Sequence, residues 1–469
     1  MRVGLISGDG LPVSGLLTIF RNVRDLGREM GLVEDTVPAD LGFTWRPDKP
    51  GFFPHGPARA YAPDWLVVEN TGSSVDIDWT ARERELSRIR ADVARHDELT
   101  PVGRTSLEDR IEAVCEPYRR GFLGWLEKHR VDWVFALNMT LSDAVPVTLA
   151  LHRAAAEYYA TRPGGVLFWD HDLFGSCAIH DEASGARLYP EQPNRCTPVP
   201  RPNAFTRWAV VSESLAREAR SYPTGLTPDI VPNILPRVPD GPLGKRHHAL
   251  ARQHGLVGGR PILLAPVRVF GVKGVEVAIE LTAAMKSLAT ARSTAVPYLL
   301  VFGSLTEDPL YAAEVMARAR HLGMDGDVIF LDGVPLASFE DPHRGWQLDE
   351  VDLLRLAQAS AGGVVFTPGV TDVETVGLAP GLAAIAGLPV AVTAYEVFRG
   401  IYGEHFSSIH VGLTRDGIRA AAAEFLEVIG PHRTGHAVAA GLERNRALVR
   451  DAFSDTPWRG LLRRLARAL

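Results

Sequence analysis

An arginine and a lysine stand five positions apart in the segment VRVFGVKG, directly after the apolar run PILLAP. The guanidinium of Arg268 is a planar fork that fits phosphate oxygens, and Lys273 adds a point charge. Gly274 then permits close backbone approach before a predicted helix, whose N-terminus favours anions. The pattern is typical of a phosphate clamp. The alternative is a structural ion pair with Glu276 or Glu280 on the following helix.

A second candidate loop, TPGVTDVETVGLAP, follows the apolar run GGVVF and carries Glu374. Exposed amides at the start of a helix bind anions or hydroxyls, and a carboxylate among them can accept hydrogen bonds from a sugar. In the alternative interpretation, Glu374 only complements the dipole of the following helix.

The segment FWDHDLFG places His171 between Asp170 and Asp172 at the end of a predicted strand. A carboxylate can fix the tautomer of a neighbouring imidazole and leave its other nitrogen for a substrate hydroxyl. A structural or solvated histidine is the alternative. Metal binding is not expected, because alternate residues of an extended chain point in opposite directions. Asn138 ends the preceding predicted strand, VDWVFALN, and joins the candidates.

Glycines follow the first predicted strand, MRVGLIS, in the segment SGDGLPVSG. Gly8, Gly10 and Gly15 lack the GxGxxG spacing of a dinucleotide site. They would let the wall of a binding site come close to a ligand.

Apolar strands alternate with amphipathic helices in both halves of the chain. After residue 260 the strands are PILLAPV, PYLLVFGS, DVIFLDGV, GGVVFTPG and PVAVTAY. Continuous apolar strands between helices indicate parallel sheets covered on both faces. The predicted fold is therefore α/β with two Rossmann-like domains that face a cleft. Every candidate follows a strand, and ligands of such sheets bind beyond the carboxyl ends of the strands.

Residues 234–260 are rich in Pro, Gly and basic residues and form the candidate linker. It separates an N-terminal domain, 1–240, from a C-terminal domain, 241–440, with a helix at 441–469 expected to pack back on the first. Residues 41–80 form an irregular insertion that crowds Pro, Gly and aromatic residues together, and such long loops are usually functional.

Composition excludes several classes of protein. The 469 residues are 46% hydrophobic and 23% charged with a net charge of -6, which is typical of a soluble globular protein and not of a nucleic-acid binder. No apolar run reaches the ~20 residues that span a membrane, and the N-terminus lacks a signal-peptide layout. The three cysteines have no CxxC spacing, so neither a disulfide framework nor a zinc site is supported, and a cytoplasmic location is expected.

Together these segments resemble the retaining glycosyltransferases of family four, which have the GT-B fold. That family carries an Arg-x4-Lys-Gly clamp on the donor diphosphate, which Arg268, Lys273 and Gly274 match. It also carries a histidine that contacts the donor sugar, which His171 matches. The family's E-x-F-G-L loop and following A-x-x-G-x-P-V segment match Glu374, Val376, Gly377, Leu378, Ala384, Gly387, Pro389 and Val390.

The resemblance implies a nucleoside-diphosphate sugar as donor. Arg268 and Lys273 would neutralise the leaving diphosphate, His171 would hold the donor sugar, and Glu374 would bind its hydroxyls. The family's retention of configuration implies same-face attack assisted by the leaving phosphate, so no side-chain base, metal or other cofactor is expected. The implied donor-binding set is Gly10, Gly303, Val376, Gly377 and Leu378, with Asn138, Asp170 and Asp172 on the acceptor side.

Within the family, DHDLF and the Tyr395 segment TAYEVF are similar to a subgroup that includes mannosyltransferases. That subgroup uses GDP-sugars, which favours a GDP-linked donor. A small soluble acceptor is expected, although the Arg-rich C-terminal helix leaves room for a lipid. The insertion from Trp45 to Trp65 would suit a lid over a ring-shaped acceptor, as in antibiotic biosynthesis. A second copy of the chain is a candidate partner.

One position departs from the family. A second glutamate normally stands eight residues after the first and grips the nucleotide ribose, but Leu382 stands there. A lost charge-assisted hydrogen bond costs about 1.5–3 kcal/mol, so donor binding would weaken without loss of the chemistry. The alternatives are a non-catalytic sugar-nucleotide binding protein with a degenerate site, a GT-B sugar-nucleotide epimerase, or a phosphorylase, whose pyridoxal lysine site is not located.

Overall fold

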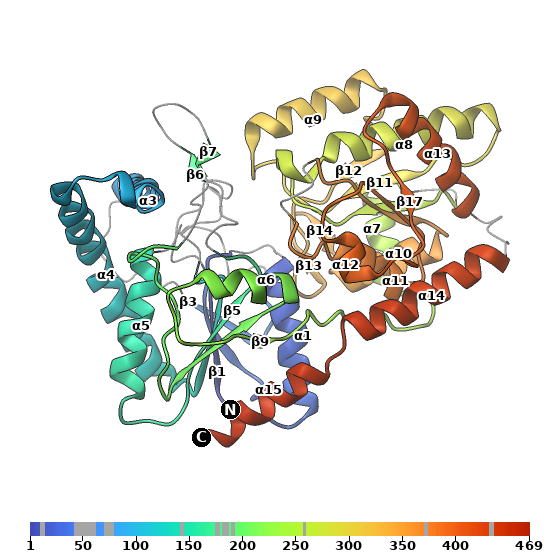
Figure 1. The fold of residues 1–469 in the computed structure, drawn as a ribbon. Coiled ribbons are helices and arrows are strands. Elements are labelled where there is room, and N and C mark those ends of the chain that lie inside the picture. Colours follow the sequence, from blue (N-terminus) through green and yellow to red (C-terminus); the bar gives the residue numbers. More distant parts are fainter. Residues whose placement is uncertain are drawn as a thin grey trace. The chain divides into compact units, whose positions relative to one another are not determined.

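The computed structural model divides the chain into two compact units (Figure 1). The first comprises Met1–Asn233 and Asp455–Leu469, and the second comprises Ile234–Ser454. Gly10 and most of the 41–80 insertion, Trp45 included, lie outside the described residues. The structure describes residues 1–9, 15–41, 62–69, 79–140, 145–173, 179–180, 187–188, 193–256, 259–369, 374–430 and 436–469.

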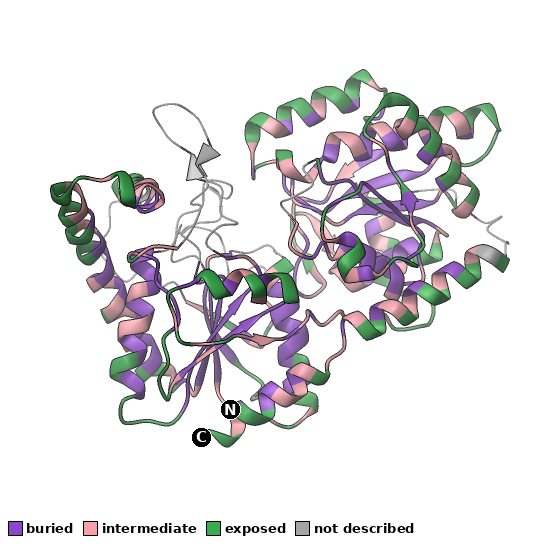
Figure 2. Cartoon of the chain, viewed as in Figure 1, coloured by how far each residue is buried: buried purple, intermediate pink, exposed green. Residues whose placement is uncertain are grey.

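A parallel sheet forms the centre of the first unit. Its described strands lie in the order β3-β2-β1-β4-β5-β8-β9, and every neighbouring pair is parallel. Strands β1, β4 and β5 are buried along their whole length (Figure 2), because helices cover both faces of the sheet. The strands are β1 (Val3–Ser7), β2 (Val37–Leu41), β3 (Leu66–Glu69), β4 (Trp133–Leu137), β5 (Gly165–Asp170), β8 (Thr206–Val210) and β9 (Asp229–Ile230).

The helices of this unit pack in pairs, α4 with α5 and α1 with α15. Helix α4 begins where the side chain of Thr100 accepts a hydrogen bond from the amide of Gly103, and it ends at Arg130, whose φ is 49°. A short antiparallel pair, β6 (Ile179–His180) and β7 (Arg187–Leu188), follows β5. The helices are α1 (Gly15–Glu29), α3 (Trp79–Ala94), α4 (Pro101–His129), α5 (Val145–Tyr159), α6 (Glu213–Glu218) and α15 (Thr456–Arg467).

The second unit has its own parallel sheet. Its described strands lie in the order β12-β11-β10-β15-β16-β17. An antiparallel hairpin of β13 and β14, which the sequence pattern did not predict, precedes α10. The strands are β10 (Ile262–Ala265), β11 (Tyr298–Val301), β12 (Val328–Phe330), β13 (Phe339–Asp341), β14 (Gly345–Gln347), β15 (Gly363–Phe366), β16 (Val390–Val392) and β17 (Ile409–His410).

Helices follow the strands of this sheet as the alternating pattern predicts. Both units are therefore parallel α/β sheets covered by helices, and the predicted α/β fold with two parallel-sheet domains is confirmed. The helices are α7 (Lys245–Gln253), α8 (Val275–Ala291), α9 (Pro309–His321), α10 (Glu350–Ala359), α11 (Ala379–Ile385), α12 (Phe398–Tyr402), α13 (Arg415–Val428) and α14 (His436–Ala452).

The units divide between Asn233 and Ile234, and the chain returns to the first unit at Asp455. The sequence pattern placed the division at 240 and the returning helix at 441–469. Helix α14 instead packs on α11 and α12 of the second unit. The returning segment is α15, which buries Trp458 against Phe135 and Trp169.

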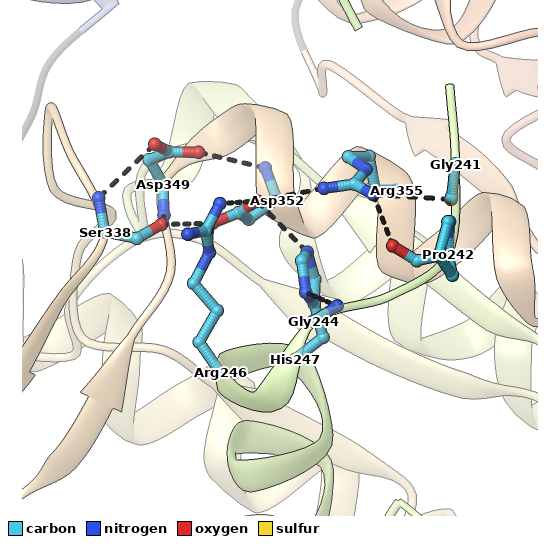
Figure 3. Close-up of polar contacts among 9 residues, drawn as sticks. All are labelled: Gly241, Pro242, Gly244, Arg246, His247, Ser338, Asp349, Asp352 and Arg355. Carbon is cyan, nitrogen blue, oxygen red and sulfur yellow. Dashed lines mark hydrogen bonds and ion pairs between the residues drawn. The ribbon is translucent and has the colours of Figure 1, made fainter. Parts of the chain in front are cut away.

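The candidate linker, residues 234–260, is not irregular throughout, because it contains helix α7. The buried carboxylate of Asp352 joins that helix to α10 (Figure 3). It lies 2.5 Å from Nε of Arg246 and 3.0 Å from Nε2 of His247, and it accepts a 2.6 Å hydrogen bond from Ser338.

The segment before α7 is fixed in the same cluster. Arg355 donates to the carbonyls of Gly241 and Pro242, at 3.3 and 2.8 Å, and the amide of Gly244 donates to Nδ1 of His247 at 3.0 Å. The chain is therefore anchored as it enters the second unit.

Candidate functional site

The Arg268–Lys273 turn lies directly after β10, where the backbone packs tightly. Gly274 has φ 59°, and a Cβ there would lie 2.0 Å from the carbonyl oxygen of Thr367. The hydroxyl of Thr367 donates to the carbonyl of Gly274 at 3.0 Å. Glycine is therefore required here because the turn rests on the backbone that follows β15.

Gly303 supports the turn from the neighbouring strand end. A Cβ at this position would lie 2.5 Å from the nitrogen of Val269 and 2.7 Å from Cα of Arg268. Its amide donates to the carbonyl of Val267 at 2.9 Å. This close packing against the Arg268 backbone leaves no room for a side chain at position 303, so the position requires glycine.

Each cation of the turn is paired with a carboxylate. Nε of Arg268 donates to Glu307 at 3.1 Å, and Glu307 is 5% exposed. Nζ of Lys273 pairs with the carboxylate of Glu374. Arg268, Lys273 and Glu374 therefore gather at one edge of the second sheet, together with an acid that the sequence interpretation missed. Glu307 also lies beyond the end of a strand, β11.

The alternative partners proposed from the sequence are wrong. Glu276 accepts a hydrogen bond from the hydroxyl of Tyr311, and Glu280 pairs with Arg318. Both glutamates are therefore engaged on α8 and α9 and do not bind the clamp cations.

Two buried tyrosines hold the loop of residues 376–378 through hydrogen bonds to its backbone carbonyls. Tyr402 donates to the carbonyl of Gly377 at 2.6 Å, and Tyr395 donates to the carbonyls of Val376 and Gly377 at 3.2 and 3.3 Å. Burial raises the pKa of both phenols, so they remain protonated donors. Gly377 has φ 66°, and a Cβ there would lie 2.5 Å from the hydroxyl oxygen of Tyr395.

Leu382 lies on α11 and is 4% exposed. The residue packs as part of the apolar core of the second unit. The structure thus gives a packing role to the position where the resemblance would place a ribose-binding glutamate.

His171 follows β5 in the first unit and is 5% exposed. Its Nε2 lies 3.0 Å from Oδ1 of Asn233, and its backbone amide donates to Oδ1 of Asn138 at 2.7 Å. Its Nδ1 has no hydrogen-bond partner among the residues that the structure describes. Burial lowers the pKa of His171 to about 4, so the ring is neutral at neutral pH.

The flanking acids do not set the tautomer of His171, contrary to the sequence prediction. Asp170 accepts hydrogen bonds from Nε1 of Trp208 at 2.8 Å and from the amide of Thr140 at 3.4 Å. Burial raises the pKa of Asp170 to about 7. Asp172 accepts from the side-chain amide of Asn138 at 3.2 Å. The imidazole is bonded by an amide, Asn233, and not by either carboxylate.

Asn138 organises the turn after β5. It has φ 51°, and its backbone amide donates to the carbonyl of Trp169 at 3.1 Å. Its Oδ1 also accepts the backbone amide of Asp172 at 3.3 Å. Asn138, Asp170, His171 and Asp172 therefore come together at the carboxyl edge of the first sheet.

Two further properties of the described residues bear on the site. Among them, no cluster of three or more His, Cys, Asp or Glu side chains has a geometry that could hold a metal ion. No helix in the described part of the chain combines the length and the apolar character that crossing a membrane requires.

No protein-family model matches the sequence, and no curated protein matches it. Solved structures do resemble the fold. A glycosyltransferase from Rickettsia africae is 12% identical with a TM-score of 0.56, covering 100% of this chain and 98% of that chain. The Anabaena protein HepE in complex with UDP-glucose is 13% identical with a TM-score of 0.57, covering 100% of both chains. Trehalose-6-phosphate synthase is 10% identical with a TM-score of 0.58, covering 99% of both chains.

At these identities the shared property is the fold. Its two parallel-sheet α/β units are those of the GT-B fold, which the sequence resemblance predicted.

Proposed function

We propose that this chain is a glycosyltransferase that takes a sugar from a nucleoside-diphosphate sugar and retains its anomeric configuration. The observation that carries the proposal is the Arg268–Lys273 turn. Two cations stand at the carboxyl edge of a parallel sheet, and Gly274 and Gly303 hold their backbone in close contact with the neighbouring strand ends. Both cations lie where the ligands of open α/β sheets bind.

The two cations would act on the leaving group. Negative charge builds on the diphosphate as the glycosidic bond breaks, and fixed positive groups at that point lower the barrier. Arg268 can bind two phosphate oxygens with its planar fork, while Lys273 supplies a point charge. This clamp supplies the positive charge in our proposal, so no metal or other cofactor is invoked.

His171 and Glu374 would bind the sugar. A neutral His171 can form a hydrogen bond with a sugar hydroxyl without adding a cation beside the forming oxocarbenium charge. Glu374, which pairs with Lys273, would accept hydrogen bonds from other hydroxyls. The leaving phosphate would take the acceptor proton during same-face attack, as the family resemblance implies.

The finer assignments are carried over from the sequence. They are a GDP-linked donor, a small acceptor from specialised metabolism such as antibiotic biosynthesis, a cytoplasmic location and pairing with a second copy. The HepE structure named above holds UDP-glucose, so UDP-linked donors belong in the same test. A sugar-nucleotide binding protein without transferase activity is the second candidate, because Leu382 is buried where the family has a ribose-binding acid.

The proposal is tested by thermal unfolding with GDP, UDP, dTDP and ADP. A nucleotide at 100 times its dissociation constant stabilises the folded state by about 2.7 kcal/mol. One nucleotide should raise the midpoint, and Arg268→Ala and Lys273→Ala should remove the shift. Arg318→Ala is the matched control, since it breaks an ion pair on α8 and α9 away from the clamp.

The nucleotide that binds then selects the sugar donors for a transfer assay with product anomers read by NMR. Transfer with retention supports the enzyme. Nucleotide binding without turnover, across a panel of sugar and natural-product acceptors, favours the binding protein. No shift with any nucleotide removes the proposal.

A further inference from the structure

The side chains of His171 and Asn233 meet where the chain leaves the first unit. Nε2 of His171 and Oδ1 of Asn233 are 3.0 Å apart. Asn233 is 2% exposed and is the last residue of the first unit before the chain enters the second. The bond therefore lies out of contact with bulk water.

This bond determines which nitrogen of the ring carries the proton. An amide oxygen only accepts, and a neutral imidazole has one N–H. The proton must lie on Nε2 for the bond to form, and Nδ1 is then a lone-pair acceptor. Among the described residues, Nδ1 is buried without a hydrogen-bond partner. An unmet buried acceptor costs free energy unless a ligand supplies a donor.

The other polar groups near the ring do not compete for this role. Asp170 is bonded to Trp208 and Thr140, and Asp172 is bonded to Asn138. Asp9 acts on the imidazole through its charge, which favours the protonated ring.

Asn233 is itself held in place by the returning helix. The carbonyl of Pro232 accepts a 3.0 Å hydrogen bond from Nε1 of Trp458. Trp458 packs edge-to-face on Trp169, with ring centroids 4.5 Å apart, and Trp169 lies 4.9 Å from the ring of His171. The backbone beside Asn233 is thus fixed by the same aromatic cluster that contacts the histidine.

We propose that Asn233 is a positioning residue that keeps the proton of His171 on Nε2 and so presents Nδ1 to a sugar hydroxyl. The assignment of the hydroxyl rests on the proposed glycosyltransferase function, whereas the tautomer does not. A hydroxyl donates one hydrogen bond to Nδ1, and the ring then polarises the sugar without taking its proton.

The experiment is NMR of the full chain with ¹⁵N-labelled histidine, in which the His171 signals are assigned by their loss in His171→Gln. The wild type should show a neutral ring protonated on Nε2 alone. Asn233→Ala should give a mixture of tautomers. Asn233→Asp should keep the Nε2 proton and raise the titration midpoint of His171, because a carboxylate beside the ring favours its charged form.

Activity and binding provide the second readout. Asn233→Ala should lower kcat/KM for transfer by about tenfold to a hundredfold, or about 1.4–2.8 kcal/mol. The binding of nucleoside diphosphate should be unchanged, since Arg268 and Lys273 lie in the second unit and Asn233 lies in the first. Asn445→Ala, which removes another buried asparagine, bonded to the backbone of Ser407 in the second unit, is the matched control. It should leave the His171 tautomer unaltered.

A ring protonated on Nδ1 in the wild type, or a single unchanged tautomer in Asn233→Ala, would overturn the inference. If Asn233→Ala does not fold, Asn233→Asp decides, because an unmoved His171 midpoint contradicts the contact. Failure of nucleotide binding or transfer in the wild type would instead count against the proposed function and leave the tautomer result standing.

Discussion

Arg268 donates the hydrogen of its Nε to Glu307, which lies 3.1 Å away and is almost wholly buried. The carboxylate orients the guanidinium and at the same time adds a negative charge beside the proposed diphosphate site. The two effects can be separated, because glutamine keeps an acceptor oxygen and loses the charge.

Glu307→Gln should therefore bind nucleoside diphosphate more tightly, by up to about tenfold, or about 1.4 kcal/mol. Glu307→Ala loses the orienting bond as well and should bind more weakly than Glu307→Gln. Isothermal titration calorimetry at two salt concentrations measures both. Glu280→Gln, which changes the acid paired with Arg318, is the control and should leave binding unaltered. Equal weakening in both Glu307 variants would show that the charge has no separate effect.

The hydroxyl of Tyr402 both donates to the carbonyl of Gly377 and accepts the amide of Gly381, at 2.6 and 3.2 Å. Tyr402→Phe leaves these two groups without that partner, so unfolding free energy should fall by about 1–3 kcal/mol per buried group. Urea unfolding measures the loss. Tyr395→Phe removes only longer bonds to the same loop and should cost less. A larger cost for Tyr395→Phe would contradict the assignment of Tyr402 as the main support.

The sequence predicted the central strands of both sheets, such as β1, β4 and β5 in the first and β10, β11 and β15 in the second, because their apolar runs are continuous and helices separate them. It did not predict β2, β3, β9 or β17, and β3, which pairs with β2 in the first sheet, lies in the 41–80 segment that was expected to be irregular. It also placed Arg268, Glu374 and His171 beyond the ends of β10, β15 and β5, since strand ends are visible in the sequence.

The partners of these residues could not be predicted. Arg268 pairs across 39 positions, His171 across 62 and Lys273 across 101. Local patterns favoured near neighbours instead, such as Glu276 on the next helix or the aspartates beside His171. Tertiary packing selects these contacts, and a local pattern carries little information about it. The β13–β14 hairpin was missed for a related reason, since its strands have three residues each and no clear alternation.

Asp352 links α7, α10 and the start of the second unit (Figure 3). Asp352→Ala leaves Arg246, His247 and Arg355 without the shared carboxylate. Removing one partner of a buried ionic cluster typically costs about 3–5 kcal/mol, so the denaturation midpoint should fall markedly. Chemical unfolding followed by circular dichroism measures this loss. Arg246→Ala removes a half-exposed partner and should cost about 1 kcal/mol or less. Equal losses in the two variants would mean that the carboxylate does not act as the centre of the cluster.

His152 on α5 stacks on Phe168, with ring centroids 4.4 Å apart, and burial lowers its pKa to about 4. The unfolded chain takes up this proton near pH 6.5. Because the pKa of His152 is lower in the folded chain than in the unfolded chain, its contribution to the unfolding free energy is fully present above pH 6.5. That contribution is lost as pH falls toward 4. The slope is about 1.4 kcal/mol per pH unit for one proton. Burial of His171 acts in the same direction, whereas Asp170, with its pKa raised to about 7, acts in the opposite one.

His152→Phe isolates one of these contributions, because the other two groups are common to both proteins. The variant should gain stability relative to wild type by about 1.4 kcal/mol for each pH unit below 6.5, measured by urea unfolding between pH 7.5 and 4.5. Val102→Ala changes an exposed side chain on α4 that carries no titrating group and should run parallel to wild type. A His152→Phe curve that also runs parallel to wild type would mean that His152 takes up its proton equally in the folded and unfolded chains.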